Sequence, residues 1–326
     1  MDTKSIKLNI TIINYRTPEL VIDCLASLVS QITVGKDSVV VVDNASGDDS
    51  LAKIEQAIAK NKWQNFVRPI ASPVNGGFSA GNNLGIKFIP ADGYLLLNSD
   101  TIVRPGAISL LRQAMVDNPE VGMVSPRLEW LDGTPQISCF RYRSPVSELI
   151  HAAATSFITK AFKQYDVPIP VSEEPIRPQW TSFACVLIRH AVVEQIGLMD
   201  EGYFMYFDDL DYCRKARNAG WEILHLPQAR VVHLRGGSSS VKADVAARKR
   251  PKEYYYASRS RYFATFYGSW GLAIANLAWL AGRGISFIRE LLGNKQPHIC
   301  EYEAQDIWQN WRDPMKPFLS IENKHS

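Results

Sequence analysis

The spacing of apolar and polar residues changes repeatedly along the first 125 residues between a strand pattern and a helix pattern. Apolar runs rich in β-branched residues predict strands at 6–13, 38–42, 66–70, 94–97 and 121–125. Apolar residues at helical spacing predict helices at 18–29, 51–59, 78–88 and 107–117. Strands that alternate with helices predict an α/β fold with a doubly wound, mostly parallel, Rossmann-like sheet.

The rest of the chain is less regular. Residues 128–177 have scattered prolines and weak periodicity, which predicts a loop-rich insert or lid. Residues 180–189 predict a further strand, and residues 210–219 predict a helix. We expect one large domain over residues 1–240, divided near residue 125, and a helical carboxyl-terminal region over residues 241–326.

Acidic residues follow two of the predicted strands. Asp43 ends the run 38–42, and Asp100 follows the run 94–97 in the sequence Asn98-Ser99-Asp100. The carboxyl ends of strands in an open α/β sheet border the crevice where ligands bind. A turn that caps the next helix is the simpler interpretation of Asn98-Ser99-Asp100. The functional interpretation is that one hard cation at Asp100 binds phosphate groups.

Glycines at positions 76, 77, 81 and 85 lie between these two strand ends. Their spacing matches neither the GxGxxG fingerprint of dinucleotide-binding folds nor the phosphate loop that ends in glycine, lysine and serine or threonine. The sequence therefore argues against an NAD site and against an ATP-binding P-loop.

A second acidic cluster, Asp208-Asp209-Leu210-Asp211, precedes the predicted helix 210–219. Acidic residues favour a helix amino terminus because the helix dipole stabilises negative charge there. Clustered carboxylates also raise one another's pKa, which suits a general base. Both roles are compatible.

Composition limits the class of protein. With 46% hydrophobic and 21% charged residues the chain is globular, and a net charge of +3 is too small to indicate a nucleic-acid partner. Five widely spaced cysteines without a CxxC pair indicate neither a disulfide framework nor a zinc ribbon. A reducing cytoplasm fits best, and the amino terminus lacks the pattern of a signal peptide.

Five sequence blocks, which follow one another along the chain, carry a resemblance to a known family. The chain resembles the family 2 glycosyltransferases with the GT-A fold, in particular their rhamnosyltransferase-like branch, over about residues 6–268. The blocks lie at 14–15, 42–46, 75–85, 97–101 and 202–238.

The resemblance implies a nucleotide-sugar half (about 1–125) and an acceptor half (about 126–240). It implies that Asp43 lies near the base, and that a divalent cation, Mg²⁺ or Mn²⁺, is held by Asp100 and His233. The donor would be a dTDP- or UDP-sugar, with rhamnose favoured. The residues expected to bind the nucleotide-sugar are Asn14, Tyr15, Asp43, Asn75, Gly77, Phe78, Asn83 and Ser99.

The same resemblance assigns the chemistry to the second acidic cluster. Asp209 is the expected general base of an inverting transfer, with Asp208 beside it, and Trp180, Phe183 and Asp211 are expected at the sugar or acceptor pocket. The chain departs from the family twice. Asn98 leaves the metal motif with one carboxylate, and Phe183 stands where relatives usually have glycine, so acceptor identity is not carried over.

Residues 262–282 contain no charged side chain, and Arg261 and Arg283 flank them. The segment is long enough to span a bilayer but only moderately apolar, so we expect an interfacial helix or helical hairpin. Trp270, Trp279 and the tyrosines would then lie at headgroup depth, with the arginines on anionic lipid. The alternative is a helix packed on the domain or a homodimer contact. Further basic residues precede the segment: Lys242, Arg248, Lys249, Arg250, Lys252 and Arg259.

The leading hypothesis is an inverting glycosyltransferase that transfers a sugar to a lipid-linked (polyprenyl-linked) acceptor or growing polysaccharide glycan, peripherally at the inner, cytoplasmic face of the cell membrane. A nucleotidyltransferase should have a glycine-rich basic loop near its start, which residues 14–20 lack. A non-catalytic nucleotide- or carbohydrate-binding module would have no use for Asp208 and Asp209.

Overall fold

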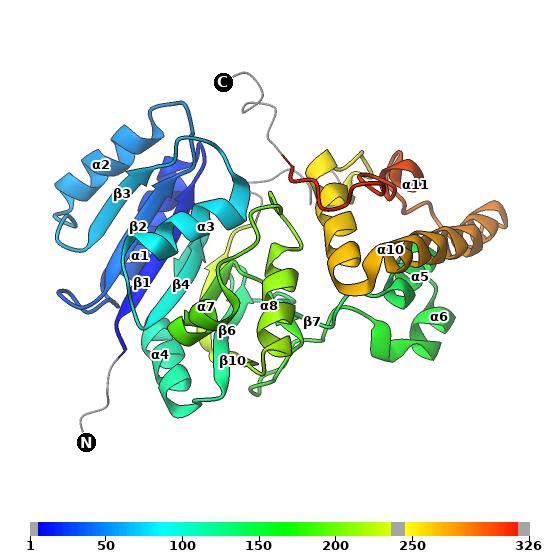
Figure 1. The fold of residues 1–326 in the computed structure, drawn as a ribbon. Coiled ribbons are helices and arrows are strands. Elements are labelled where there is room, and N and C mark those ends of the chain that lie inside the picture. The colour runs from blue at the N-terminus through cyan, green and yellow to red at the C-terminus, as the bar shows by residue number, and fades with distance from the viewer. Residues whose placement is uncertain (1–5, 236–244, 319–326) are drawn as a thin grey trace.

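The computed structural model describes residues 6–235 and 245–318 (Figure 1). Within these residues eight strands form one sheet, in the order β3-β2-β1-β4-β9-β6-β10-β5. Strands β3, β2, β1 and β4 are parallel, and β10 is parallel to β6, whereas β9 and β5 run antiparallel to their neighbours. The strands are β1 (Leu8–Asn14), β2 (Ser38–Asp43), β3 (Val67–Ala71), β4 (Gly93–Asn98), β5 (Thr101–Val103), β6 (Val121–Glu129), β9 (Cys185–Arg189) and β10 (Glu222–His233).

Helices cover both faces of the sheet, which confirms the doubly wound, mostly parallel α/β fold. Apolar residues of α1, α2 and α4 pack on one face, and residues of α3, α7 and α8 pack on the other. The apolar runs of the central strands meet helices on both sides, so they are buried without alternation. The helices are α1 (Pro18–Leu28), α2 (Ser50–Lys60), α3 (Gly77–Phe88), α4 (Ala107–Asp117), α7 (His190–Ile196) and α8 (Asp208–Asn218).

The strand predicted over residues 180–189 is wrong as a single element. The chain forms β8 (Trp180–Thr181), which pairs with β7 (Cys139–Phe140) in a separate two-stranded sheet, and then β9. Between them the Ser182 backbone N–H donates to the Ser138 carbonyl at 2.9 Å, so the chain changes partners there. An apolar run does not encode such a change because it depends on distant neighbours.

The loop-rich insert predicted over residues 128–177 contains regular elements. Helix α5 (Pro145–Ala153) is followed by α6 (Ser156–Ala161) and by a short 3₁₀ turn, η1 (Lys163–Tyr165). Proline at the first turn of α5 and a Ser144 hydroxyl that accepts from the Ser147 N–H at 3.2 Å explain where this helix begins.

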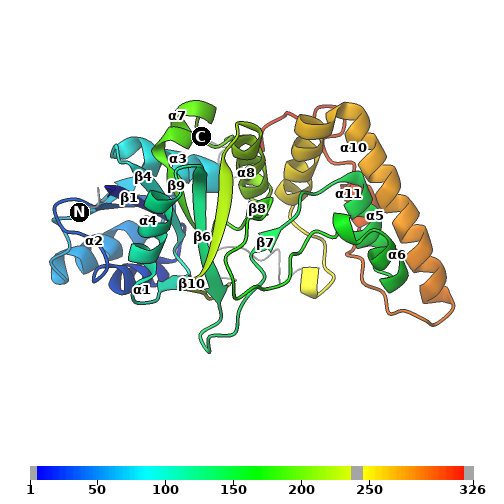
Figure 2. The same ribbon diagram turned by 90° about the horizontal axis from the view of Figure 1, so that it is seen from below.

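The carboxyl-terminal region is helical, as expected, and its long helix bends so sharply that its two halves contact each other. Helix α10 (Glu253–Leu291) has 39 residues and bends at Gly268, whose φ of 70° is non-helical. It packs against α5, and the short α11 (Glu303–Asp306) lies beside it (Figure 2). The expected boundary at residue 240, the block 236–238 and Lys242 lie outside the described residues.

The burial of α10 corrects part of the membrane prediction. Trp279, expected at headgroup depth, is 1% exposed, and Tyr262 is also buried. Arg259 is buried against Glu148 at 2.8 Å, and Arg261 pairs with Asp200 at 2.9 Å, so neither arginine is available to lipid. Both contacts lie inside the fold because α10 closes over α5 and the loop before α8.

Candidate active site

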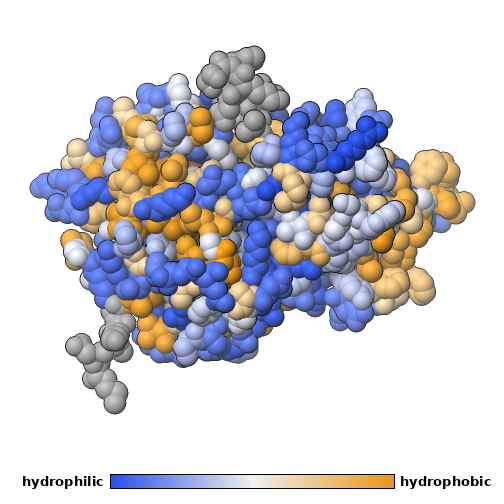
Figure 3. Space-filling view, in the orientation of Figure 1, coloured by the Kyte–Doolittle hydropathy of each residue, from blue (hydrophilic) through white to orange (hydrophobic). Residues whose placement is uncertain are grey.

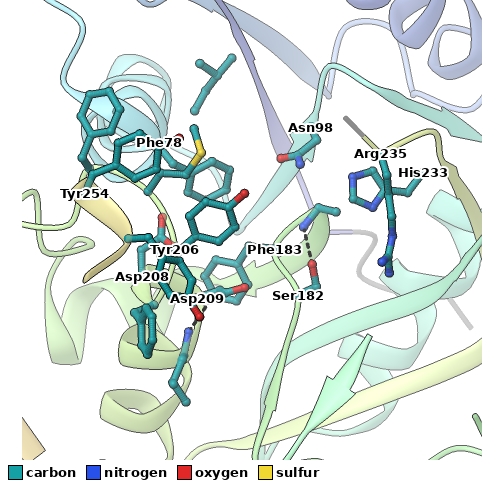
Figure 4. Close-up of a pocket in the computed structure, with 18 of the residues that line it drawn as sticks. Phe78, Asn98, Ser182, Phe183, Tyr206, Asp208, Asp209, His233, Arg235 and Tyr254 are labelled. Atoms are coloured by element: carbon teal, nitrogen blue, oxygen red, sulfur yellow. Dashed lines mark hydrogen bonds between the residues drawn. The ribbon is translucent and has the colours of Figure 1, made fainter. Parts of the chain in front are cut away.

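A cavity of about 1370 Å³ lies at the carboxyl ends of β1 and β4, where the acidic residues were expected (Figure 4). Segments from both halves of the large domain and from the start of α10 line it. Most of the predicted site residues meet there: Tyr15, Asn75, Gly77, Phe78, Ser99, Asp100, Trp180, Phe183, Asp208, Asp209 and His233.

Strand pairing brings Asp100 and His233 together. Asp100 directly precedes β5, and His233 at the end of β10 pairs with Thr101 in the antiparallel register. The Leu234 N–H donates to the Asp100 carbonyl at 2.9 Å, and the Gln136 amide donates to the His233 carbonyl at 2.8 Å. Both side chains are buried, and His233 Nε2 lies 3.5 Å from Asp100 Oδ1.

Asp100 and His233 could supply two of the ligands of a divalent cation. Two donors 3.5 Å apart can share one ion that each binds at about 2.0–2.2 Å. Over residues 6–235 and 245–318, no group of three or more histidine, cysteine, aspartate or glutamate side chains could hold a metal. The protein therefore supplies a minority of an ion's ligands here, and the remainder would have to come from a bound diphosphate and water.

The second acidic pair lies across the cavity at the start of α8 (Figure 4). Asp208 is buried, whereas Asp209 is only partly buried and its Oδ1 accepts from the Leu210 N–H at 2.8 Å. Burial and the adjacent Asp209 carboxylate raise the pKa of Asp208 well above its usual range. Asp209 is thus the more accessible of the two carboxylates.

The turn that carries this pair has a strained backbone. Tyr206 and Phe207 are consecutive residues at φ 67° and 64°, and left-handed non-glycine residues cost about 1–2 kcal/mol each. Aromatic side chains of α10 hold the turn. The Tyr255 ring packs edge-on against both residues, with centroids 5.6 Å away in each case. Arg143 lies over the Phe207 ring at 5.2 Å.

The glycine stretch contacts the same turn. The Phe78 N–H donates to the Phe204 carbonyl at 2.7 Å, and a Cβ at Gly77 would lie 2.0 Å from that oxygen. The Asn44 amide, which was not predicted, donates to Asn75 Oδ1 at 3.0 Å and to the Gly77 carbonyl at 3.1 Å. Glycine at position 77 therefore allows α3 to dock on the loop before Asp208.

Four predicted residues lie outside the cavity lining. Asn14 donates to Asp43 Oδ1 at 2.7 Å, and both residues are buried. Asn83 donates to the Met199 carbonyl at 2.9 Å and so joins α3 to the loop before α8. Asp211 accepts from the Tyr203 hydroxyl at 3.1 Å and lies 2.7 Å from Lys215. Their assignment to ligand binding stays a prediction.

The structure adds basic and aromatic residues that sequence reasoning missed. Arg235 lines the cavity beside His233, stacks over Trp130 at 5.5 Å and donates to the Ile137 carbonyl at 3.3 Å (Figure 4). Tyr254 at the start of α10 lies 5.3 Å from Phe204. A basic residue two positions after His233 and the run of tyrosines at 254–256 were the signals available in the sequence.

The arrangement of strands and helices is that of the GT-A glycosyltransferase fold. A mannosyltransferase from Pyrobaculum calidifontis, solved with GDP-mannose and Mn²⁺, superposes with a TM-score of 0.57 at 14% identity, over 96% of this chain and 87% of that chain. GalNAc-T7, solved with UDP, GalNAc and Mn²⁺, has the same score at 12% identity, over 95% of this chain and 55% of that one.

The chain belongs to the glycosyltransferase family 2, whose "Glycosyltransferase like family 2" model matches residues 7–255. An N-acetylglucosaminyl-diphospho-decaprenol L-rhamnosyltransferase of Mycobacterium tuberculosis is 30% identical over 231 residues, covering 66% of this chain and 72% of the relative. A dTDP-rhamnosyl transferase of Shigella flexneri is 24% identical over 222 residues, 66% of each chain. Family membership confirms the resemblance and the expected enzyme class.

Proposed function

We propose that this glycosyltransferase transfers rhamnose, or a related hexose, with inversion from a nucleoside-diphosphate sugar to a lipid-linked glycan acceptor. The observation that carries the proposal is the arrangement of two groups across one cavity. His233 and Arg235 lie on one side, and Asp208 and Asp209 lie on the other (Figure 4). Asp100 lies beside His233, at 3.5 Å. Rhamnose is favoured because two of the relatives are rhamnosyltransferases.

The first group suits the diphosphate of the donor. Asp100 and His233 would hold Mg²⁺ or Mn²⁺, which would stabilise the negative charge of the departing nucleoside diphosphate. Arg235 adds a fixed cation beside the single carboxylate of the Asn98-Ser99-Asp100 motif. Because its guanidinium is oriented by Trp130 and the Ile137 carbonyl, it loses little freedom when it binds phosphate oxygens.

The second group suits the acceptor hydroxyl. An inverting transfer needs a base that removes the hydroxyl proton as the oxygen attacks the anomeric carbon. Asp209 is assigned this role because it is the more accessible carboxylate and stands at a helix amino terminus, where its charged form is stabilised. The cavity walls beside it, Trp180, Phe183 and Tyr254, would contact the sugar rings.

A lipid-linked acceptor places the enzyme in the cytoplasm at the inner membrane face. The Mycobacterium tuberculosis relative is named for a diphospho-decaprenol acceptor, and Lys252 at the border of the cavity would suit an anionic acceptor. The construction of a cell-surface glycan is the proposed biological role.

The test is a panel of nucleoside-diphosphate sugars, with dTDP-rhamnose, UDP-glucose and UDP-N-acetylglucosamine among them, incubated with a polyprenyl-diphosphate-linked sugar. Release of nucleoside diphosphate that requires both donor and acceptor, together with a lengthened glycan, is the expected result. If no donor on the panel gives a release of nucleoside diphosphate that depends on the acceptor, the proposed transfer reaction is contradicted.

A further inference from the structure

One outward face of α10 carries apolar side chains along most of its second half. Trp270, Ile274, Leu277, Ile288 and Leu291 lie at successive spacings of four, three, eleven and three residues, and all are exposed, Trp270 by 84% and Leu291 by 71%. Ala281 and Gly284 occupy the same face between Leu277 and Ile288. We call this face the apolar stripe; at 1.5 Å per residue it is about 32 Å long.

The opposite face of the same helix is covered by protein. Trp279 and Ser286 are buried, and a Cβ at Gly282 would lie 2.5 Å from the Leu149 carbonyl of α5. The buried Arg259 donates to Asn276 Oδ1 at 2.7 Å on that face. A helix held in this way cannot be surrounded by lipid, although α10 is the helix among the described residues that is long and apolar enough to cross a membrane.

Helix α6 extends the apolar surface. Its Phe157 is 80% exposed, and α6 is fixed to the end of α10 because Arg289 donates to Thr155 Oγ1 at 2.8 Å and Lys295 donates to the Ala154 carbonyl at 2.7 Å. Figure 3 shows hydrophobic residues gathered at the end of the molecule that α10 forms.

Most of the charged residues around this surface are basic. Residues 154–165 and 262–289 contain no aspartate or glutamate, and Lys160 and Lys163 are exposed beside Phe157. Glu290, the acidic residue between Ile288 and Leu291, is neutralised by Arg283 at 2.8 Å. A basic rim favours an anionic lipid surface. It disfavours a second copy of this chain, because a twofold contact would bring the two basic rims together.

We infer that the apolar stripe and Phe157 form a face that lies in the plane of an anionic membrane, with the second half of α10 parallel to the surface and inserted on one side only. The first turns of the same helix line the cavity through Tyr254 and Tyr255, so docking would hold the cavity beside lipid-linked molecules. That consequence rests on the proposed function; the docking itself does not.

The experiment is vesicle flotation of the full-length protein, without donor or acceptor, on phosphatidylcholine vesicles with and without phosphatidylglycerol. The test variant is Ile274→Ser/Leu277→Ser/Ile288→Ser. The matched control, Val34→Ser/Phe88→Ser/Leu110→Ser, removes three exposed apolar side chains elsewhere on the chain. Thermal melts and nucleoside-diphosphate titration check that both variants are folded.

We expect the wild type to float with phosphatidylglycerol vesicles. The partition coefficient of the stripe variant onto these vesicles should be lower than that of wild type by roughly tenfold or more. The control should stay within about twofold of wild type. Equal binding by wild type and stripe variant, or no binding by wild type, would overturn the inference. So would a stable dimer in sedimentation equilibrium that the stripe variant abolishes. A protein that floats but releases no nucleoside diphosphate would refute the proposed function and leave this inference standing.

Discussion

Replacing Gly77 by alanine tests whether the contact between the glycine stretch and the loop before Asp208 shapes the active site. Gly77 has φ +80°, and its added Cβ would lie 2.0 Å from the Phe204 carbonyl oxygen and 2.6 Å from the carbonyl carbon. Gly106 is the matched control, because its φ is +82° and no atom lies within 4 Å of its added Cβ.

Both substitutions place an alanine in the left-handed backbone region, but only Gly77→Ala also brings the new Cβ against the Phe204 carbonyl. Left-handed alanine costs about 1–2 kcal/mol at either position. At position 77 the loop must also move by about 1 Å, which adds roughly 1–3 kcal/mol of overpacking. It also weakens the hydrogen bond from the Phe78 N–H to Phe204, worth about 1 kcal/mol. We therefore expect the free energy of unfolding to fall by about 1–2 kcal/mol for Gly106→Ala and by about 3–6 kcal/mol for Gly77→Ala.

Urea denaturation measures both losses, and turnover of the folded variants measures the effect on the site. A loop displaced by about 1 Å should lower turnover of Gly77→Ala by up to about 10²-fold at full folding, with Gly106→Ala near wild type. Equal losses of stability in the two variants, or normal turnover in Gly77→Ala, would show that the contact with Phe204 does not position the acidic pair.

The remaining predictions concern charge in the cavity. Asp209→Asn should lower turnover by about 10²-fold or more with donor affinity nearly intact, and Asp208→Asn should do less; normal turnover of Asp209→Asn would place the base on another carboxylate. Asp100→Ala should weaken nucleoside-diphosphate binding and remove its dependence on Mg²⁺ or Mn²⁺ in calorimetric titration, whereas metal-dependent binding at wild-type strength would refute its role. Arg235→Gln should weaken nucleoside-diphosphate binding measured without metal by about tenfold, the loss of one charged hydrogen bond, and an unchanged affinity would exclude a phosphate contact. The raised pKa of Asp208 means that the folded state holds this proton more tightly than the unfolded chain does, so its contribution to stability falls as pH rises from the unfolded pKa through the folded pKa. The melting temperature of Asp208→Asn, relative to that of wild type, should therefore be higher at pH 8 than at pH 4. A difference that does not change with pH would argue against a buried, protonated Asp208.

Local pattern was enough to predict the alternating strands and helices and the strand-end position of Asp100. Buried parallel strands are continuous apolar runs, and polar residues at their ends stand out in the sequence. The five blocks also identified the family. These features depend on residues that are neighbours along the chain, so periodicity and motif spacing carry them.

Other features depend on which distant segments pack together. His233 reaches Asp100 only because β10 pairs with β5, and β9 runs antiparallel between β4 and β6 although its apolar residues would suit either direction. In α10 the uncharged segment gives no polar face to mark the outside, so Trp279 and Trp270 were equivalent by sequence. Packing on α5 buries the first and exposes the second, because the helix can present only one side to its own domain.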